Sequence, residues 1–274
     1  MGLTLKFKLK KLKEKGKQNL FVIPYFFTFA NAVFGLFSVI KTLEGDFLSA
    51  AYCIMLAGVM DLFDGRLARA FGSTSVLGME LDSLCDAVSF CFAPAILLYS
   101  WYLHNIGIFG FIAVSLYLCC GLLRLAKFNI LSSEDSSFPR SSPGPFGLRS
   151  GRDAEGQAGS AQEFFIGLTT TLSAFLIAQL VLNFDWISHK LLPFLQNPYG
   201  LGLFIITIAL LMISPVPFLS FKKVNPKLSL VGGFLVIIIF AIGFAYGMPL
   251  LFIGILSYIL SSIFYFIYSK CMPE

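Results

Sequence analysis

Long apolar runs constrain the fold of this chain more than any other feature. The chain has 274 residues, of which 57% are hydrophobic, and its mean hydropathy is +0.82. In a bilayer every backbone polar group has to be bonded within the protein, and an apolar run of about 20 residues satisfies this as a helix. The sequence therefore predicts an all-α polytopic membrane protein, and a water-soluble domain is excluded.

The apolar runs predict about eight transmembrane helices. We place them at residues 20–41, 47–64, 77–103, 106–129, 164–184, 200–221, 229–247 and 249–269. Residues 1–19 precede them as a basic interfacial segment, residues 20–221 form a six-helix core, and residues 222–274 add two C-terminal helices. Within the core, residues 132–162 are rich in Ser, Gly and Pro, which is typical of a flexible cytoplasmic loop.

The basic residues indicate how the chain is oriented. Of its 20 Lys and Arg residues, all except Lys41 and Lys190 lie at the termini or in links that the predicted spans place on one side. The positive-inside rule assigns this side to the cytoplasm. The lysines of residues 1–19 alternate with Leu and Phe, which favours contact with anionic lipid headgroups. The apolar run that follows extends to Ile40, which suits a retained anchor better than a cleaved signal peptide.

Four carboxylates interrupt this apolar pattern at the cytoplasmic side. Asp61 and Asp64 are spaced i,i+3 at the end of one predicted span, and Asp82 and Asp86 are spaced i,i+4 at the start of the next. On helices each pair shares one face, and antiparallel spans would bring all four to the same membrane surface. Four negative charges would repel each other there unless cations lay among them. The alternative is a proton relay or an ion path in a transporter.

All the ligands that the four Asp residues offer are oxygen atoms, and this indicates which cation such a site would hold. Carboxylates favour hard cations, so Mg²⁺ or Mn²⁺ is expected and Zn²⁺ is not. Two such ions can clamp a diphosphate and stabilise both the attacking and the leaving oxygen.

The same stretch resembles the signature of the CDP-alcohol phosphatidyltransferases. It has the form D-x-x-D-G-x-x-A-R, then eight residues, then G-x-x-x-D-x-x-x-D. The residues at the fixed positions are Asp61, Asp64, Gly65, Ala68, Arg69, Gly78, Asp82 and Asp86. A proton relay would not require the Gly, Ala and Arg positions, so the pattern favours the enzyme family over a transporter.

The resemblance implies a substrate and roles for the four acids. The substrate would be CDP-diacylglycerol, with CMP as the leaving group. Asp61, Asp64 and Asp82 would bind metal. Asp86 would help to bind the second ion and would act as the general base on the acceptor hydroxyl.

The other fixed positions are expected to accommodate the nucleotide and its phosphates. Gly65 and Gly78 lack side chains, which would let the nucleotide approach the backbone closely, although ordinary helix packing is the alternative. Arg69 could offer a bidentate contact to phosphate. Ala68 would provide room.

The first predicted span carries a further polar stripe. Thr28 and Asn31 are spaced i,i+3 within I-P-x-x-x-T-x-x-N-x-x-x-G, which ends at Gly35. This arrangement is similar to the family's first helix, which borders the nucleotide. The alternative is that the two side chains only bond a neighbouring helix.

Within the family, the chain is most similar to the bacterial phosphatidylserine synthases. Residues 124–129 read R-L-A-K-F-N and resemble the R-L-A-R-F-N that ends the corresponding helix of that branch. Residues 80–95 are close to its form of the second half of the motif. Arg124 and Lys127 could pair with the carboxylate of serine, or could simply anchor a helix end at the interface. Thr169-Thr170-Thr171 replaces a normally Pro-rich stretch, near where a polar acceptor could enter.

We therefore expect transfer of a phosphatidyl group from CDP-diacylglycerol to L-serine. Glycerol 3-phosphate or an inositol phosphate as acceptor remains an alternative within the class, and a cation- or proton-coupled transporter is the alternative outside it. Membrane lipids are expected partners, nucleic acid is not, and the resemblance suggests a homodimer. The expected location is the cytoplasmic membrane of a bacterium, with both termini and the site facing the cytoplasm.

Overall fold

The computed structural model describes residues 22–71, 76–137, 164–214, 216–219 and 250–271. Its helices are α2 (Val22–Leu43), α3 (Phe47–Phe71), α4 (Val76–Asp86), the π-helical η1 (Ala87–Phe92), α5 (Ala93–Trp101), the 3₁₀-helical η2 (Leu103–Ile106), α6 (Ile108–Ser137), α7 (Thr170–Leu182), α8 (Phe184–Trp186), the π-helical η3 (Ile187–Leu191), the 3₁₀-helical η4 (Pro193–Gln196), α9 (Pro198–Ile213) and α11 (Leu250–Cys271). Two short strands accompany them, β1 (Phe164–Ile166) and β2 (Pro217–Leu219).

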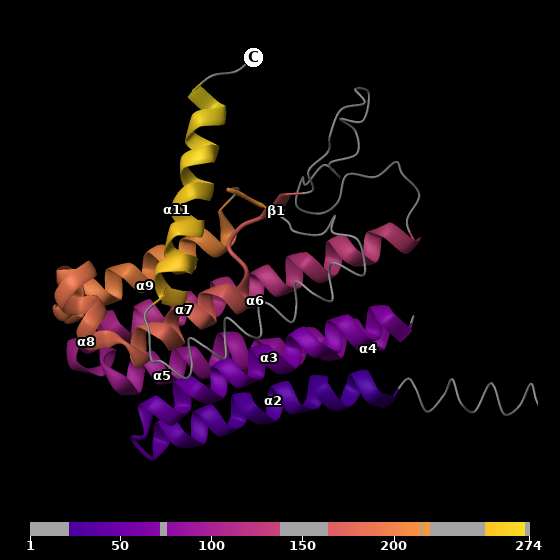
Figure 1. Ribbon diagram of the computed structural model, residues 1–274, viewed down its shortest axis with the longest axis horizontal. Helices are drawn as coiled ribbons and strands as arrows, with labels where there is room; N and C mark the ends of the chain where they lie inside the picture. Colours follow the sequence, from indigo (N-terminus) through magenta and orange to yellow (C-terminus); the bar gives the residue numbers. More distant parts are fainter. Residues whose placement is uncertain (1–21, 72–75, 138–163, 215, 220–249, 272–274) are drawn as a thin grey trace, which may run out of the picture.

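The first helices run side by side and reverse direction at each connection (Figure 1). α2 packs along α3, α6 packs along α9, and α7 packs against α3. The start of α2, the end of α3, the start of α4 and the end of α6 consequently lie at one end of the molecule, which we call the motif end. The α2–α3 and α5–α6 connections lie at the opposite end.

Five described helical segments are long and apolar enough to cross a membrane. They are Tyr25–Leu43, Phe47–Leu67, Leu77–Trp101, Ile108–Ile130 and Leu251–Tyr268. A sixth span is possible if α7 is counted together with the segment Phe184–Leu191, which bends away from it by 86°. The prediction of a polytopic helical membrane protein is confirmed. The count of eight stays a prediction, because α9 has 16 residues and the expected span 229–247 lies outside the described residues.

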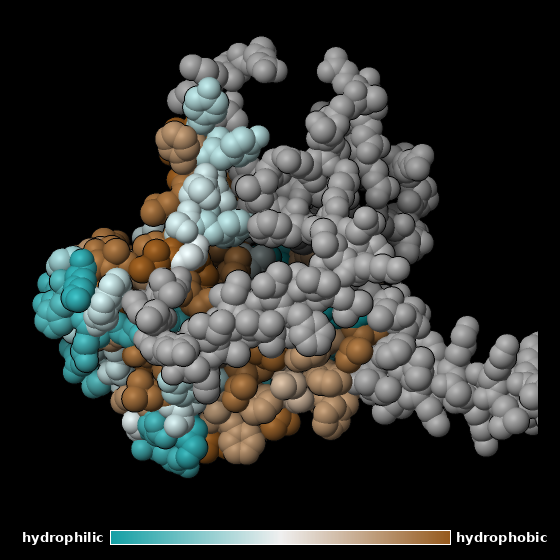
Figure 2. All heavy atoms as spheres, viewed as in Figure 1, coloured by the Kyte–Doolittle hydropathy of each residue, from teal (hydrophilic) through white to brown (hydrophobic). Residues whose placement is uncertain are grey.

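The outer surfaces of the helices match this assignment. Large apolar side chains stand exposed along one stripe of α2: Phe26, Phe29, Val33, Leu36, Phe37 and Ile40. Figure 2 shows hydrophobic side chains over this side of the molecule, and hydrophilic ones gathered at the connections of the end opposite the motif end. Such an apolar band is what a helix presents to lipid.

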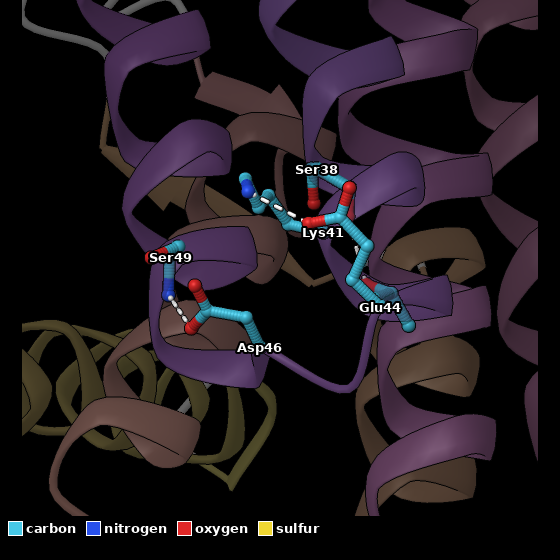
Figure 3. A network of polar contacts seen from close by, with 6 residues as sticks. Ser38, Lys41, Glu44, Asp46 and Ser49 are labelled. Carbon is cyan, nitrogen blue, oxygen red and sulfur yellow. Dashed lines mark hydrogen bonds and ion pairs between the residues drawn. The ribbon is translucent and has the colours of Figure 1, made fainter.

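The turn between α2 and α3 is fixed by polar contacts (Figure 3). Gly45 takes the left-handed φ of 81° that the turn requires. The Lys41 ammonium donates to the Glu44 carboxylate at 2.7 Å, and the Ser49 N–H donates to Asp46 Oδ1 at 3.1 Å. Asp46 thereby caps α3. The side chain and backbone of Ser49 both donate to this carboxyl and lower its pKa below the ordinary value.

An antiparallel strand pair, which the sequence did not predict, sets the start of α7. β1 and β2 pair with Phe165 opposite Phe218. Gly167 follows β1 with a φ of 83°, and its N–H donates to the Val216 carbonyl at 3.0 Å. A Cβ at Gly167 would lie 2.5 Å from the Met212 carbonyl oxygen, so the close approach requires glycine. The start of α7 is thus joined to the end of α9.

Candidate active site

Three of the four predicted acids converge at the motif end. Asp61 and Asp64 lie on α3 and Asp82 lies on α4, and each offers a carboxylate oxygen within 4.8 Å of the other two. The chain reverses between these helices, so the ends that carry the acids meet, as the sequence predicted. Asp86, one turn after Asp82, interacts electrostatically with all three.

The cluster contains oxygens that lack a partner. Among the described residues, Asp64 Oδ2 and Asp82 Oδ1 are buried and make no hydrogen bond. Leaving a buried acceptor unsatisfied is costly, and three carboxylates at this separation repel one another. An oxygen-preferring divalent cation would relieve both costs, so the donor set fits Mg²⁺ or Mn²⁺.

The polar stripe of α2 faces this cluster. The buried Thr28 hydroxyl hydrogen-bonds to the Asp64 carboxylate. Asn31, which is fully buried, donates from Nδ2 to Asp86 Oδ1 at 2.9 Å. Both side chains therefore bond a neighbouring helix, and their partners are the acids of the site. Asn31 Oδ1 has no partner among the described residues and adds another acceptor there.

A close contact between α2 and η1 sets the position of Asn31. The buried Ser89 hydroxyl donates to the Asn31 carbonyl oxygen at 2.9 Å. One turn further along α2, a Cβ on Gly35 would lie 2.4 Å from Ser89 Oγ. The absence of a side chain at Gly35 therefore allows α2 to approach the π-helical turn that follows Asp86. The sequence pattern contained Gly35, but nothing in it indicated Ser89.

Arg124 also belongs to this region. It lies on α6, and its Nη1 donates to Thr170 Oγ1 on α7 at 3.3 Å. Its Nε is buried without a partner among the described residues, and its charge interacts with Asp86. Lys127, the other predicted acceptor contact, has an exposed side chain. The structure thus brings Arg124 to the cluster and shows no such contact for Lys127.

The remaining motif positions lie on the same helices. A Cβ added to Gly65 would meet no atom of the described residues within 4 Å. Gly78 lies in the first turn of α4. Ala68 and Arg69 lie near the end of α3, and their side chains are outside the described residues. Open space at Gly65 is compatible with a ligand that approaches the backbone.

A hydrogen-bonded link that sequence reasoning missed joins α4 to α6. The Ser83 hydroxyl donates to Asn129 Oδ1 at 2.8 Å, and Asn129 Nδ2 donates to Glu80 Oε2 at 3.1 Å. Ser83 directly follows Asp82 on α4, and Glu80 lies two residues before it. The link therefore helps to hold α4, and with it Asp82, against α6. The only sequence signal was the Asn that ends R-L-A-K-F-N.

The fold and the site together define a helical membrane protein with a buried carboxylate cluster at one end. A family model for CDP-alcohol phosphatidyltransferases matches residues 21–259. The chain belongs to the CDP-alcohol phosphatidyltransferase family, and it is an enzyme of phosphotransferase type.

Curated relatives with related names support this assignment. The chain is 30% identical over 221 residues to a CDP-diacylglycerol–serine O-phosphatidyltransferase of Helicobacter pylori strain J99, covering 81% of this chain and 80% of that protein. A protein of the same name from Bacillus subtilis is 38% identical over 116 residues, covering 42% of this chain and 66% of that protein. An archaetidylserine synthase of Methanothermobacter thermautotrophicus is 31% identical over 129 residues, covering 46% of this chain and 55% of that protein.

Proposed function

We propose that this chain transfers a phosphatidyl group from CDP-diacylglycerol to the hydroxyl of L-serine, giving phosphatidylserine and CMP. The observation that carries the proposal is the cluster of Asp61, Asp64 and Asp82, with two buried oxygens lacking partners among the described residues. These acids stand in the stretch that resembles the signature of the family to which the chain belongs. The names of the relatives support serine as the acceptor.

The acids provide the ligands for a divalent cation. Asp61, Asp64 and Asp82 would hold Mg²⁺ or Mn²⁺, and Asp86 would contribute to a second ion. Such ions, when bound, neutralise the diphosphate and stabilise the charge that develops on the departing CMP. Thr28 holds the Asp64 carboxylate through its hydroxyl, which orients one ligand in advance.

Asp86 is placed to act as the general base. Asn31 donates to its Oδ1 at 2.9 Å and thereby orients the carboxylate, and the proton would pass to its other oxygen. In the proposed step the serine oxygen attacks the phosphorus attached to diacylglycerol, its proton passes to Asp86, and the bond to the CMP oxygen breaks. Gly65 would give the nucleotide access to the backbone of α3.

Arg124 is the proposed partner of the serine carboxylate. Its buried Nε has no hydrogen-bond partner in the part of the chain that the structure describes, and its charge lies within electrostatic range of Asp86. Glycerol 3-phosphate or an inositol phosphate would bring a doubly charged phosphate and would favour a denser basic pocket. Lys222 and Lys223 would have to join Arg124 and Lys127 to supply it, so these acceptors remain the alternative.

The proposed setting is the cytoplasmic membrane of a bacterium, with the motif end in the cytoplasm. The predicted spans assign 18 of the 20 Lys and Arg residues to the same side of the membrane as the Asp cluster, which supports the orientation. The apolar stripe of α2 supports contact with membrane lipids. A homodimer is the assembly that the family resemblance favours.

Release of CMP by purified protein in detergent tests the proposal. CDP-diacylglycerol and Mg²⁺ or Mn²⁺ would be supplied with serine, glycerol 3-phosphate, inositol phosphate or no acceptor, for wild type and Asp86→Asn. Serine-dependent release that is lost in Asp86→Asn is the expected result. Release with another acceptor would overturn the serine assignment. Absence of release from folded protein would instead favour the transporter, which needs a sealed membrane.

A further inference from the structure

A chain of buried hydroxyl groups connects Arg124 to the helical turn that follows Asp86. Thr170 Oγ1 accepts from Arg124 Nη1 at 3.3 Å. Ser173 Oγ donates to the Thr170 carbonyl oxygen at 2.7 Å and lies 3.2 Å from the Tyr117 hydroxyl. The Tyr117 hydroxyl donates to the Phe90 carbonyl oxygen of η1 at 2.9 Å.

The carbonyl at the end of this chain belongs to a π-helical turn. η1 begins directly after Asp86, and Ser89 of the same turn bonds α2. Tyr117 and Ser173 are fully buried. The Ser173 and Tyr117 hydroxyls have one proton each, and these protons go to the Thr170 and Phe90 carbonyl oxygens. The contact between the two hydroxyls is then held by packing and not by a proton of its own. Thr170 is consequently held at a fixed place relative to Asp86.

Thr170 also has a well-defined backbone. It is the first residue of α7, and the preceding Thr169 caps the helix by accepting from the Leu172 N–H at 3.3 Å. Gly167 and the β1–β2 pair hold the entry to α7 against the end of α9. The Thr170 side chain is 2% exposed, so its hydroxyl has little choice of partner other than Arg124.

The contact determines which edge of the guanidinium is available. Nη1 is used by Thr170, whereas Nε is buried and without a partner among the described residues. A carboxylate can bind an arginine through two parallel hydrogen bonds, and the edge formed by Nε and Nη2 suits this geometry. Thr170 thus leaves that edge free and limits the rotation of the guanidinium.

We propose that Thr170 is a positioning residue for the acceptor: its hydroxyl holds Arg124 in the orientation that receives the acceptor's carboxylate. This inference rests on the proposed function. It gives a role to the Thr169-Thr170-Thr171 stretch, which the proposed chemistry of the Asp cluster does not use. The same contact makes acceptor binding, and not the binding of CDP-diacylglycerol, depend on α7.

The test is a comparison of steady-state kinetics for Thr170→Val and Thr170→Ser. Valine keeps the shape and removes the hydroxyl, whereas serine keeps the hydroxyl. A hydrogen bond to a charged group contributes about 1.5 kcal/mol at the lower end of its range, which corresponds to about tenfold. We expect the KM for serine to rise by about this factor in Thr170→Val. The KM for CDP-diacylglycerol should stay unchanged in both variants.

Two controls separate the possible failures. Thr171→Val changes the adjacent half-buried residue and should leave both KM values at the wild-type level. Melting temperatures show whether each variant is folded. An unchanged KM for serine in folded Thr170→Val, or a rise that Thr170→Ser shares, would overturn the inference while the function stands. A rise in the KM for CDP-diacylglycerol as well as in the KM for serine would also overturn the inference, since it would indicate that the substitution disturbs the whole site. Wild-type protein without serine-dependent activity would overturn the proposed function itself.

Discussion

Replacing Gly65 with alanine should remove most of the transfer activity without weakening the fold. Within the described part of the chain, a Cβ at this position meets no atom within 4 Å. Gly65 is four residues after Asp61 on α3, so the two share a helix face. The added methyl group would therefore project into the space beside the Asp cluster, where the proposed function places the nucleotide.

The size of the effect follows from contact distances. A ligand atom touching the Gly65 Cα would lie about 3.5–4 Å from it. A methyl carbon on a bond of about 1.5 Å would reduce that separation to about 2–2.5 Å, so the ligand would have to move by about 1–1.5 Å. Misplacement of a reacting group by about 1 Å can lower a rate by about 100-fold. Alanine is meanwhile favoured over glycine within a helix by about 1 kcal/mol.

The assay combines CMP release with thermal unfolding in detergent. Gly254→Ala on α11 is the matched control, because a Cβ there also meets no atom of the residues that the structure describes within 4 Å. Both variants should melt at or above the wild-type temperature, and only Gly65→Ala should lose activity. Near-wild-type kcat/KM in Gly65→Ala would refute close approach of the substrate to this part of α3.

Three further predictions concern the packing of α2 against η1, the proposed metal ligand Asp64 and the turn between α2 and α3. Gly35→Ala places a Cβ 2.4 Å from Ser89 Oγ, so the free energy of unfolding should fall by about 1–3 kcal/mol; an unchanged melting temperature would contradict this. In Asp64→Asn, the Mn²⁺ concentration for half-maximal CMP release should rise at least about tenfold, and no change would mean that Asp64 is not a ligand. The Ser49 donors lower the pKa of Asp46 in the folded chain, so its contribution to stability is present above about pH 4 and is lost as the pH falls through the lowered pKa. The difference in melting temperature between wild type and Asp46→Ala should therefore shrink in acid, and a difference independent of pH would contradict the assignment.

The sequence predicted the convergence of the acids because that depends on local spacing. Helical periodicity places Asp61 and Asp64 on one face, and the reversal between two spans brings Asp82 to them. Long apolar runs likewise predicted the first residues of α2, α3 and α6 to within two residues, although α3 and α6 extend further than the predicted spans. These features need only the helix period and the thickness of a bilayer.

Contacts between distant segments could not be predicted in this way. The approach of Gly35 to Ser89 depends on the crossing of α2 and η1, and the bond from Arg124 to Thr170 depends on how α6 meets α7. The π-helical turn after Asp86 leaves no pattern in an apolar run. Such features arise from packing among helices, which one sequence does not encode locally.

The entry to α7 shows how backbone geometry overrides hydropathy. The apolar pattern predicted a span over 164–184, but Gly167 takes a φ of 83° and the helix begins only at Thr170. At the other end Asn183 donates back to the Gln179 carbonyl oxygen at 3.3 Å, and the chain then bends by 86°. A short apolar helix between a glycine turn and a bend has the composition of a span without its length.

The most direct test of the account is identification of the lipid product in a competition between acceptors. Purified protein would receive CDP-diacylglycerol, Mg²⁺ or Mn²⁺, and equal concentrations of isotope-labelled serine, glycerol 3-phosphate and inositol phosphate, and the lipids would be analysed by mass spectrometry. The account predicts labelled phosphatidylserine, with one CMP released for each molecule formed. A phosphatidylglycerol phosphate or a phosphatidylinositol phosphate in its place would contradict the acceptor, and no new lipid from folded protein would contradict the reaction.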